Sequence, residues 1–272
     1  GVDDIRHGYQ NDLRLLQLSA NTQGLQLHAQ HQAGTLQAWH LQGPVALATQ
    51  RLDQAALRPQ GWQLQVQLVA NQEQLELNGQ LSSAADLVLG LQLHHSPNRG
   101  LQVKAQLPEL FLRAGNPLAD TLAAWPALLD LNNGRLSADA SLSQSPNSSA
   151  PSVHFNLTGT GLSGIYDRTE FTGLDGQLQI DLKQQQLVIE LVELNLKQAN
   201  PGIPIGPLQL RGRYSAPLSQ FDKGQLAVQQ AQTVLIDGTA RLTPGQWDLS
   251  QDRLLFPVEL RGLKLDRLFT LY

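Results

Sequence analysis

The chain contains no cysteine and no methionine, and only 5% of its residues are aromatic. Without cysteine it has neither a disulfide scaffold nor a thiolate site. Charged residues make up 15% of the sequence and the formal net charge is -4, with no basic stripe, which argues against binding to nucleic acid or to an anionic membrane. No apolar run approaches the ~20 residues that a transmembrane helix requires, and no signal peptide is visible.

Leucine and glutamine are the most frequent residues, and they alternate. In residues 62–68 every second residue is Trp, Leu or Val, and each residue between them is Gln. Successive side chains of a strand point to opposite faces, so this pattern predicts a sheet with one apolar face and one wetted face. The alternation returns at residues 87–93, 101–107, 136–142, 178–182, 208–210 and 254–260. The sequence therefore predicts a mainly β fold with little helix to cover the apolar face.

Short breaks between the alternating runs indicate how the strands are connected. Residues 62–107 predict four strands, with breaks at 71–72, 82–83 and 96–100, which favours an antiparallel meander. Residues 187–194 are apolar on both faces in places, which indicates either a strand covered on both sides or a bulge that swaps faces.

A Gly followed by Gln or Arg and then Leu occurs at four places, and we interpret it as a device that opens a strand. These glycines are Gly79, Gly134, Gly176 and Gly224.

One short helix is predicted between residues 117 and 131. Asn116 is a suitable N-cap, Pro117 fits the first helical position, and Pro126 interrupts the helix. A second helix is expected to start at Asp266.

Residues 143–152 are rich in Ser and Pro and are either a domain linker or a long mobile loop. We favour the loop, because the strand pattern continues on both sides. Residues 1–272 are then a single elongated β domain. Because the first residue is not methionine, we expect this domain to be a fragment of a longer chain.

No arrangement of polar residues indicates catalysis. The seven histidines do not show the converging spacing of a zinc site, and no acid pair resembles a general acid and base held in a cleft. A Gly-rich phosphate loop, a G-x-S-x-G elbow and an H-E-x-x-H helix are all missing from the sequence. We therefore predict no enzyme activity, no metal and no cofactor.

Two interpretations of the apolar face remain open. In the first, two sheets bury it between them, as in a structural or adhesive β-sandwich or solenoid module with a closed core. In the second, the sheet curves into a trough whose inner face stays available to lipid. An enzyme acting on polysaccharide ranks third, because the four tryptophans do not obviously converge on a groove.

Four stretches of the second half resemble a known family. They are residues 174–180, 200–208, 224–228 and 258–268. Over about residues 110–272 the chain resembles the C-terminal region of YdbH-type, AsmA-like proteins of the Gram-negative envelope, a family also labelled "dicarboxylate transport". A dicarboxylate site needs fixed Arg or Lys donors, whereas this chain offers an apolar lining.

The resemblance implies a long, highly twisted antiparallel sheet curved into an open trough, the β-taco of AsmA-like proteins, with one or two short helices. It implies a periplasmic protein, held in the inner membrane by an anchor outside this fragment. Its implied function is phospholipid transport between the inner and outer membranes through a hydrophobic groove. A small outer-membrane lipoprotein is the implied partner near the C-terminal end.

The alternation assigns residues to these functions. The residues predicted to line the lipid groove and to contact acyl chains are Leu64, Val66, Leu68, Leu89, Leu91, Val103, Leu178, Ile180, Ile189, Leu208, Leu210 and Val228. A terminal strand is predicted to pair with the lipoprotein by strand addition, through an edge formed by Leu254, Phe256, Val258 and Leu260. Pro257 lacks a backbone N–H and limits pairing on one side of this edge.

Overall fold

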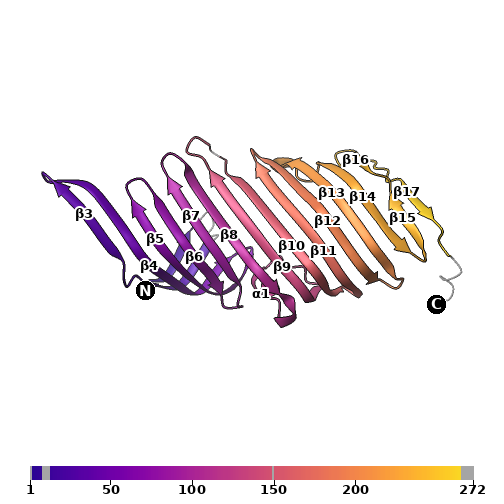
Figure 1. The fold of residues 1–272 in the computed structure, drawn as a ribbon, viewed down its shortest axis with the longest axis horizontal. Coiled ribbons are helices and arrows are strands. Elements are labelled where there is room, and N and C mark those ends of the chain that lie inside the picture. The colour runs from indigo at the N-terminus through magenta and orange to yellow at the C-terminus, as the bar shows by residue number, and fades with distance from the viewer. Residues whose placement is uncertain (1, 8–12, 149, 265–272) are drawn as a thin grey trace. The chain divides into compact units, whose positions relative to one another are not determined.

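The computed structural model describes residues 2–7, 13–148 and 150–264 (Figure 1). Most of these residues lie in strands, which form one antiparallel sheet of 17 strands. The predicted mainly β, antiparallel fold with very little helix is therefore confirmed. No described helix has the length and the hydropathy needed to cross a bilayer.

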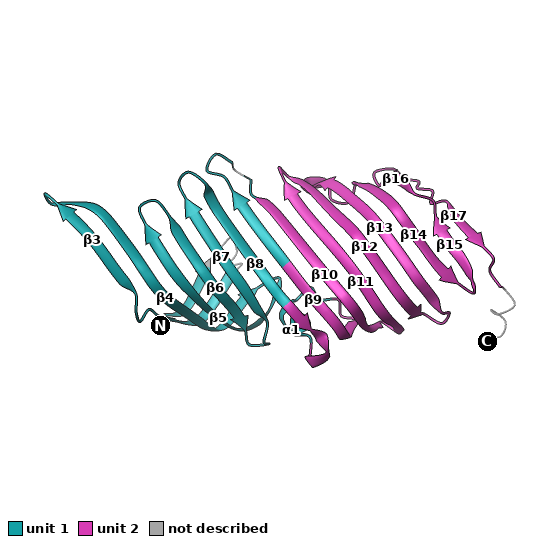
Figure 2. Ribbon diagram, in the orientation of Figure 1, with its two compact units in different colours: residues 1–108, 116–125, 139–151 teal, residues 109–115, 126–138, 152–272 magenta. Residues whose placement is uncertain are grey.

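The chain divides into two compact units (Figure 2). Unit 1 comprises residues 1–108, 116–125 and 139–151, and unit 2 comprises residues 109–115, 126–138 and 152–272. Strand β9 (Leu129–Gln144) contributes residues to both units, and strand β10 (Ser152–Tyr166) follows it after the Ser- and Pro-rich loop. That the chain acts as one domain, and that this loop is mobile, stay predictions.

Unit 1 is built on a meander of long strands. Its strands are β1 (Val2–His7), β2 (Leu13–Asn21), β3 (Gln26–Gln32), β4 (Thr35–Gln54), β5 (Leu57–Asn71), β6 (Leu75–Ser83), β7 (Val88–Ser96) and β8 (Gly100–Phe111), the last of which belongs to this unit up to Pro108. Strands β4 to β8 pair in sequence order. Strand β3 pairs with the first half of β4, strand β2 pairs with its second half, and β1 pairs with β2. The four strands predicted in residues 62–107 are confirmed as β5 to β8.

Unit 2 repeats this arrangement. Its further strands are β10 (Ser152–Tyr166), β11 (Thr169–Lys183), β12 (Gln186–Asn200), β13 (Ile205–Pro217), β14 (Gln225–Leu235), β15 (Gly238–Leu242), β16 (Gly245–Asp248) and β17 (Val258–Arg261). Strands β10 to β14 pair in sequence order. The first half of β14 pairs with β16 and its second half with β15, which also pairs with β17. The register of β12 shifts between Leu191 and Leu194, so the bulge alternative for residues 187–194 is confirmed.

The predicted helix exists but is short. Helix α1 spans Pro117–Thr121, and the Asn116 side chain caps it by accepting from the backbone N–H of Ala119 at 3.2 Å. It ends before Pro126 because Leu122 turns extended and forms a β-bridge with Leu57 of β5. Two 3-10 turns, Leu112–Ala114 and Leu218–Gln220, are the other helical segments among the described residues. The helix expected from Asp266 lies outside the described residues.

Thr121 fixes α1 to the sheet of unit 1. The residue is completely buried, and its hydroxyl accepts from the Gln60 amide at 3.2 Å and lies 3.4 Å from the Ser83 hydroxyl. Ser83 in turn accepts from the backbone N–H groups of Ala85 and Leu87. This buried polar cluster joins the helix to β5 and β6.

The interpretation of the repeated glycines as strand openers is wrong for three of the four. Gly79 lies in the middle of β6, Gly134 in the middle of β9 and Gly176 in the middle of β11, and only Gly224 directly precedes a strand. At Gly79 and Gly134 the reason is close packing of backbones. At Gly79 a Cβ atom would collide with the backbone of Gln65 on the neighbouring strand.

Candidate functional site

One side of the unit 1 sheet carries the aliphatic residues of β4 to β8, and we call it the unit 1 aliphatic face. Directly opposite residues of a ladder point to the same side of a sheet, so the register defines its members. The row through Leu64 continues to Leu47 of β4 and to Leu81 of β6. The predicted lining residues of this unit all lie on the face: Leu64, Val66, Leu68, Leu89, Leu91 and Val103.

The two sides of this sheet differ sharply in chemistry. Five rows of opposite residues cross the sheet through Trp62, Leu64, Val66, Leu68 and Ala70 of β5, and no described Asp, Glu, Lys or Arg occurs in them. The opposite side presents the exposed amides of Gln63, Gln65 and Gln67. The alternation of the sequence thus becomes an uncharged apolar side and a neutral, hydrogen-bonding side.

Unit 2 has an equivalent side, which we call the unit 2 aliphatic face. Ile180 of β11 lies opposite Phe155 and Ile189, and Leu178 lies opposite Leu157 and Leu191. Register shifts in β12 and between β13 and β14 keep apolar residues on this side in the next strands. The predicted lining residues of this unit share the face: Leu178, Ile180, Ile189, Leu208, Leu210 and Val228.

The aliphatic faces are only partly covered. Of the twelve predicted lining residues, Val66 and Val228 are buried, with 7% and 8% of their surface exposed, and the other ten are half-buried. In a closed sandwich the inner faces pack to the density of a protein interior, and central leucines lose almost all contact with water. The half-buried leucines therefore leave apolar surface accessible.

The total exposed surface agrees with this. The chain exposes 17701 Å². A compact monomer of 29.7 kDa exposes about 11,600 Å², and two compact bodies of half that mass expose about 14,000 Å² together. The excess is therefore not explained by a division into two units.

A small apolar pocket of 220 Å³ lies on the unit 2 aliphatic face. It is lined by the side chains of β13, β14, β15 and β17, among them Leu208, Leu210, Leu242 and Val258. Two predicted lining residues and one residue of the predicted partner edge therefore meet at the same hollow.

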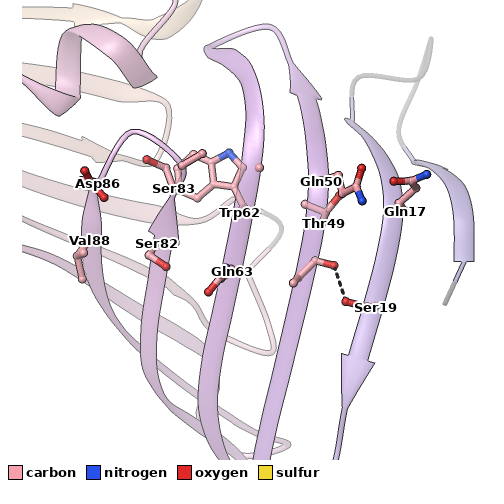
Figure 3. A pocket seen from close by; sticks show the side chains of 13 residues that line it. Gln17, Ser19, Thr49, Gln50, Trp62, Gln63, Ser82, Ser83, Asp86 and Val88 are labelled. Carbon is pink, nitrogen blue, oxygen red and sulfur yellow. Dashed lines mark hydrogen bonds between the residues drawn. The ribbon is translucent and has the colours of Figure 1, made fainter.

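A polar pocket of 690 Å³ lies in unit 1 (Figure 3). Its lining includes the side chains of Gln17, Gln63 and Ser82, together with Ser19, whose hydroxyl donates to the Ala48 carbonyl at 3.3 Å. Asp86 is the single acidic group in this lining. The pocket offers hydrogen bonds but no paired acid and base. No cluster of three metal-ligating side chains occurs among the described residues.

The predicted partner edge is shorter than expected. Strand β17 begins at Val258, so Leu254 and Phe256 precede the strand instead of forming it. The reason is Pro257, which has no N–H to donate and whose carbonyl accepts from the backbone of Thr243 at 3.0 Å. All four residues of β17 are exposed, Val258 to 59% and Leu260 to 57%.

Sequence reasoning missed an aromatic group on the unit 2 aliphatic face. Tyr214 and Trp247 continue the row of Ile180 and Ile189, because Tyr214 lies opposite Ile189 and both aromatic residues lie opposite Leu226. The alternation around Trp247 is too short to signal this position. Only the register of β14 and β16 brings the two rings into the same row.

Two carboxyl groups with a lowered pKa, those of Asp248 and Asp4, lie away from the aliphatic faces. The Ser250 hydroxyl and backbone N–H donate to the Asp248 carboxylate and lower the pKa of that carboxyl. At the other end of the chain the guanidinium groups of Arg14 and Arg6 lower the pKa of Asp4.

A comparison with family models matches residues 5–272 to the model "YdbH-like", described as intermembrane phospholipid transport protein YdbH. No curated protein and no solved structure matches the chain.

Proposed function

The chain belongs to the YdbH-like family of intermembrane phospholipid transport proteins, and from this premise we propose that its aliphatic faces carry the lipid. Phospholipid acyl chains lie along the twelve lining residues and move between the inner and outer membranes of a Gram-negative envelope. The observation that carries the proposal is an aliphatic side on each unit, uncharged in the rows of unit 1 that cross β5, whose lining residues the protein leaves mostly half-buried.

The energetics require continuous shelter. Each buried methylene is worth about 0.8 kcal/mol, so a sixteen-carbon chain gains on the order of 12 kcal/mol by leaving water. A carrier with a water gap would impose part of this penalty on every passing lipid. Adjacent rows of Leu, Val and Ile avoid such gaps within each unit.

A transport surface must also release its cargo. Aliphatic side chains offer shallow, similar contacts at successive positions, whereas a deep specific pocket would retain the lipid. The apolar hollow at Leu208 and Leu210 has a volume of 220 Å³, too small for a whole acyl chain. Head groups stay in water, so the function requires no charged head-group site and no catalytic group.

The location and the partner belong to the same proposal. A protein that passes lipid between two membranes works in the periplasm, and an inner-membrane anchor outside residues 1–272 would hold it there. Strand β17 supports strand addition by a small outer-membrane lipoprotein, because its residues are exposed and its backbone is extended. Hydrogen exchange tests this partner. In the ladder with β15 the backbone groups of Glu259 and Arg261 face β15, so the amides of Val258 and Leu260 face the open edge. These two amides gain protection on lipoprotein addition if strands pair there, and unchanged protection refutes it.

Site-specific photocrosslinking tests the lipid path. A photoreactive residue at Leu64 or Ile180 is expected to capture phospholipid, and the same residue at the neighbouring Gln65 or Gln179 is expected to capture none. Capture from the glutamine positions alone would place the lipid on the other side of the sheet.

Native mass spectrometry of the purified chain distinguishes lipid transport from the alternative function, a structural or adhesive module with a closed core. Co-purified phospholipid supports transport, and a lipid-free protein that captures none from vesicles supports a structural module with a closed core.

A further inference from the structure

Aromatic side chains gather at one end of the strands of unit 2. The Tyr214 and Phe221 rings meet edge to face with centroids 5.8 Å apart, and the Trp247 and Phe256 rings stack at 4.9 Å. Leu226 of β14 lies between the two pairs, opposite both Tyr214 and Trp247. We call these five residues the aromatic row. The row continues the unit 2 aliphatic face, because Tyr214 lies opposite Ile189.

The outer members of the row are exposed to water. Phe221 lies in the loop between β13 and β14 and is 54% exposed. Phe256 and its neighbour Leu255 lie in the loop between β16 and β17 and are 45% and 70% exposed. Adjacent exposed side chains of this size mark a surface that contacts another apolar body.

The polar atoms of the row are already bonded within the protein. The Trp247 indole N–H donates to the Leu255 carbonyl at 2.7 Å, and the Tyr214 hydroxyl donates to the Phe221 carbonyl. In hydrocarbon an unpaired donor is costly, so internal bonding makes these rings suitable for the boundary between lipid and water.

The charges of the two loops balance and give no preference for anionic lipid. Asp222 and Lys223 lie beside Phe221, and Asp252 and Arg253 precede Leu255. Charges of both signs give little net attraction to an anionic surface, so binding would depend on apolar insertion.

We infer that the loops 218–224 and 249–257 dock unit 2 on a phospholipid bilayer and insert Phe221, Leu255 and Phe256 at its interface. The inference rests on the proposed function, because a lipid that leaves the aliphatic face needs an apolar phase directly beside it. The aromatic row supplies that junction: its inner member Tyr214 lies opposite Ile189 on the proposed lipid path, and its outer members Phe221 and Phe256 are exposed loop residues.

Vesicle flotation with a matched control tests the docking surface. The test variant is Phe221→Ser with Leu255→Ser. The control is Tyr166→Ser with Leu128→Ser, which removes side chains of the same unit that are 54% and 56% exposed. With phosphatidylcholine vesicles, the unaltered chain is expected to float. The test variant should bind at least about ten-fold more weakly, because it loses the apolar area of two inserted side chains. The control should bind like the unaltered chain.

Several outcomes overturn the inference. These are an unaltered chain that does not float, equal loss in both variants, or flotation that requires anionic lipid and disappears at high salt. A vesicle-independent dimer that the test variant abolishes would assign the surface to a second copy. In the same variants, and in the unaltered chain, photocrosslinking from position 180 measures the capture of a soluble short-chain phospholipid. Capture that persists while flotation is lost keeps the proposed function and isolates the docking step, and absent capture in the unaltered chain refutes the proposed function itself.

Discussion

A carboxylate placed on the unit 1 aliphatic face should stop lipid movement before it stops folding. The informative substitution is Leu64→Asp, since Leu64 lies in the middle of β5 between Leu47 and Leu81. The neighbouring Gln65 provides the control, because Gln65→Asp adds the same charge to the opposite side of the same strand. Gln65 lies between Ala46 and Gln80, so the control creates no contact between like charges within its row.

The expected magnitudes differ for folding and for transport. Leu64 is half-buried, so its removal should lower the free energy of unfolding by about 1–2 kcal/mol. The new carboxylate still reaches water and stays ionised. An acyl chain passing it would lose shelter for roughly four methylenes, or about 3 kcal/mol, which slows passage by about 100-fold.

Fluorescent phospholipid transfer between donor and acceptor vesicles measures the effect. Transfer by Leu64→Asp is expected to fall by about two orders of magnitude. Transfer by Gln65→Asp is expected to match the unaltered chain. Circular dichroism during thermal unfolding verifies that both variants are folded. A folded Leu64→Asp protein that transfers lipid at the unaltered rate would refute the lipid path across β5.

Three further predictions concern stability and titration. Thr121→Val should lower the free energy of unfolding by about 1–3 kcal/mol, because it removes the acceptor of the part-buried Gln60 amide. Thr121→Ser keeps the hydroxyl and should retain most of the stability of the unaltered chain, as measured by denaturant unfolding. Gly79→Ala should cost about 1–3 kcal/mol through its backbone collision, and Gly90→Ala, whose Cβ meets nothing closer than 3.8 Å, should be tolerated in the same assay. The pKa of Asp248 is lowered in the folded state, so the turn at Ser250 should hold above the ordinary carboxyl pKa and loosen only as pH falls through the lowered value; NMR titration giving an ordinary pKa would contradict this.

The strands were predictable wherever alternation was strict. Between Trp62 and Leu68 the alternating glutamines show which residues point to the polar side of the sheet and which to the apolar side. The pairing of β5 with β6 keeps this alternation, since Leu64 lies opposite Leu81 and Gln65 opposite Gln80. The bulge of β12 was one of two interpretations that the sequence allowed, because two apolar residues in succession fit either a bulge or a strand covered on both sides, and the register of β12 shows the bulge.

Features set by tertiary contacts were not predictable. The helix pattern after Pro117 extends past Thr121, but the chain leaves the helix so that Leu122 can form a bridge with Leu57, which is 65 residues away. Gly79 resembles a turn glycine in sequence, and only the approach of Gln65 on the neighbouring strand explains it. The aromatic row likewise depends on the register of β13, β14 and β16, which local sequence does not encode.

Bulges explain how the unit 2 aliphatic face stays continuous over long strands. In β12 the residues on this face have odd numbers up to Leu191 and even numbers from Leu194. In β14 they have even numbers up to Val228 and odd numbers from Ala231. A one-residue slip sends all following side chains to the other side of a sheet, so an unbulged strand with this sequence would turn half of its leucines towards the glutamines. A closed core tolerates a small polar gap if a partner satisfies it, but a lipid path does not, because every passing methylene meets the gap. Placement of bulges where the apolar parity changes is therefore the arrangement that a transport surface requires.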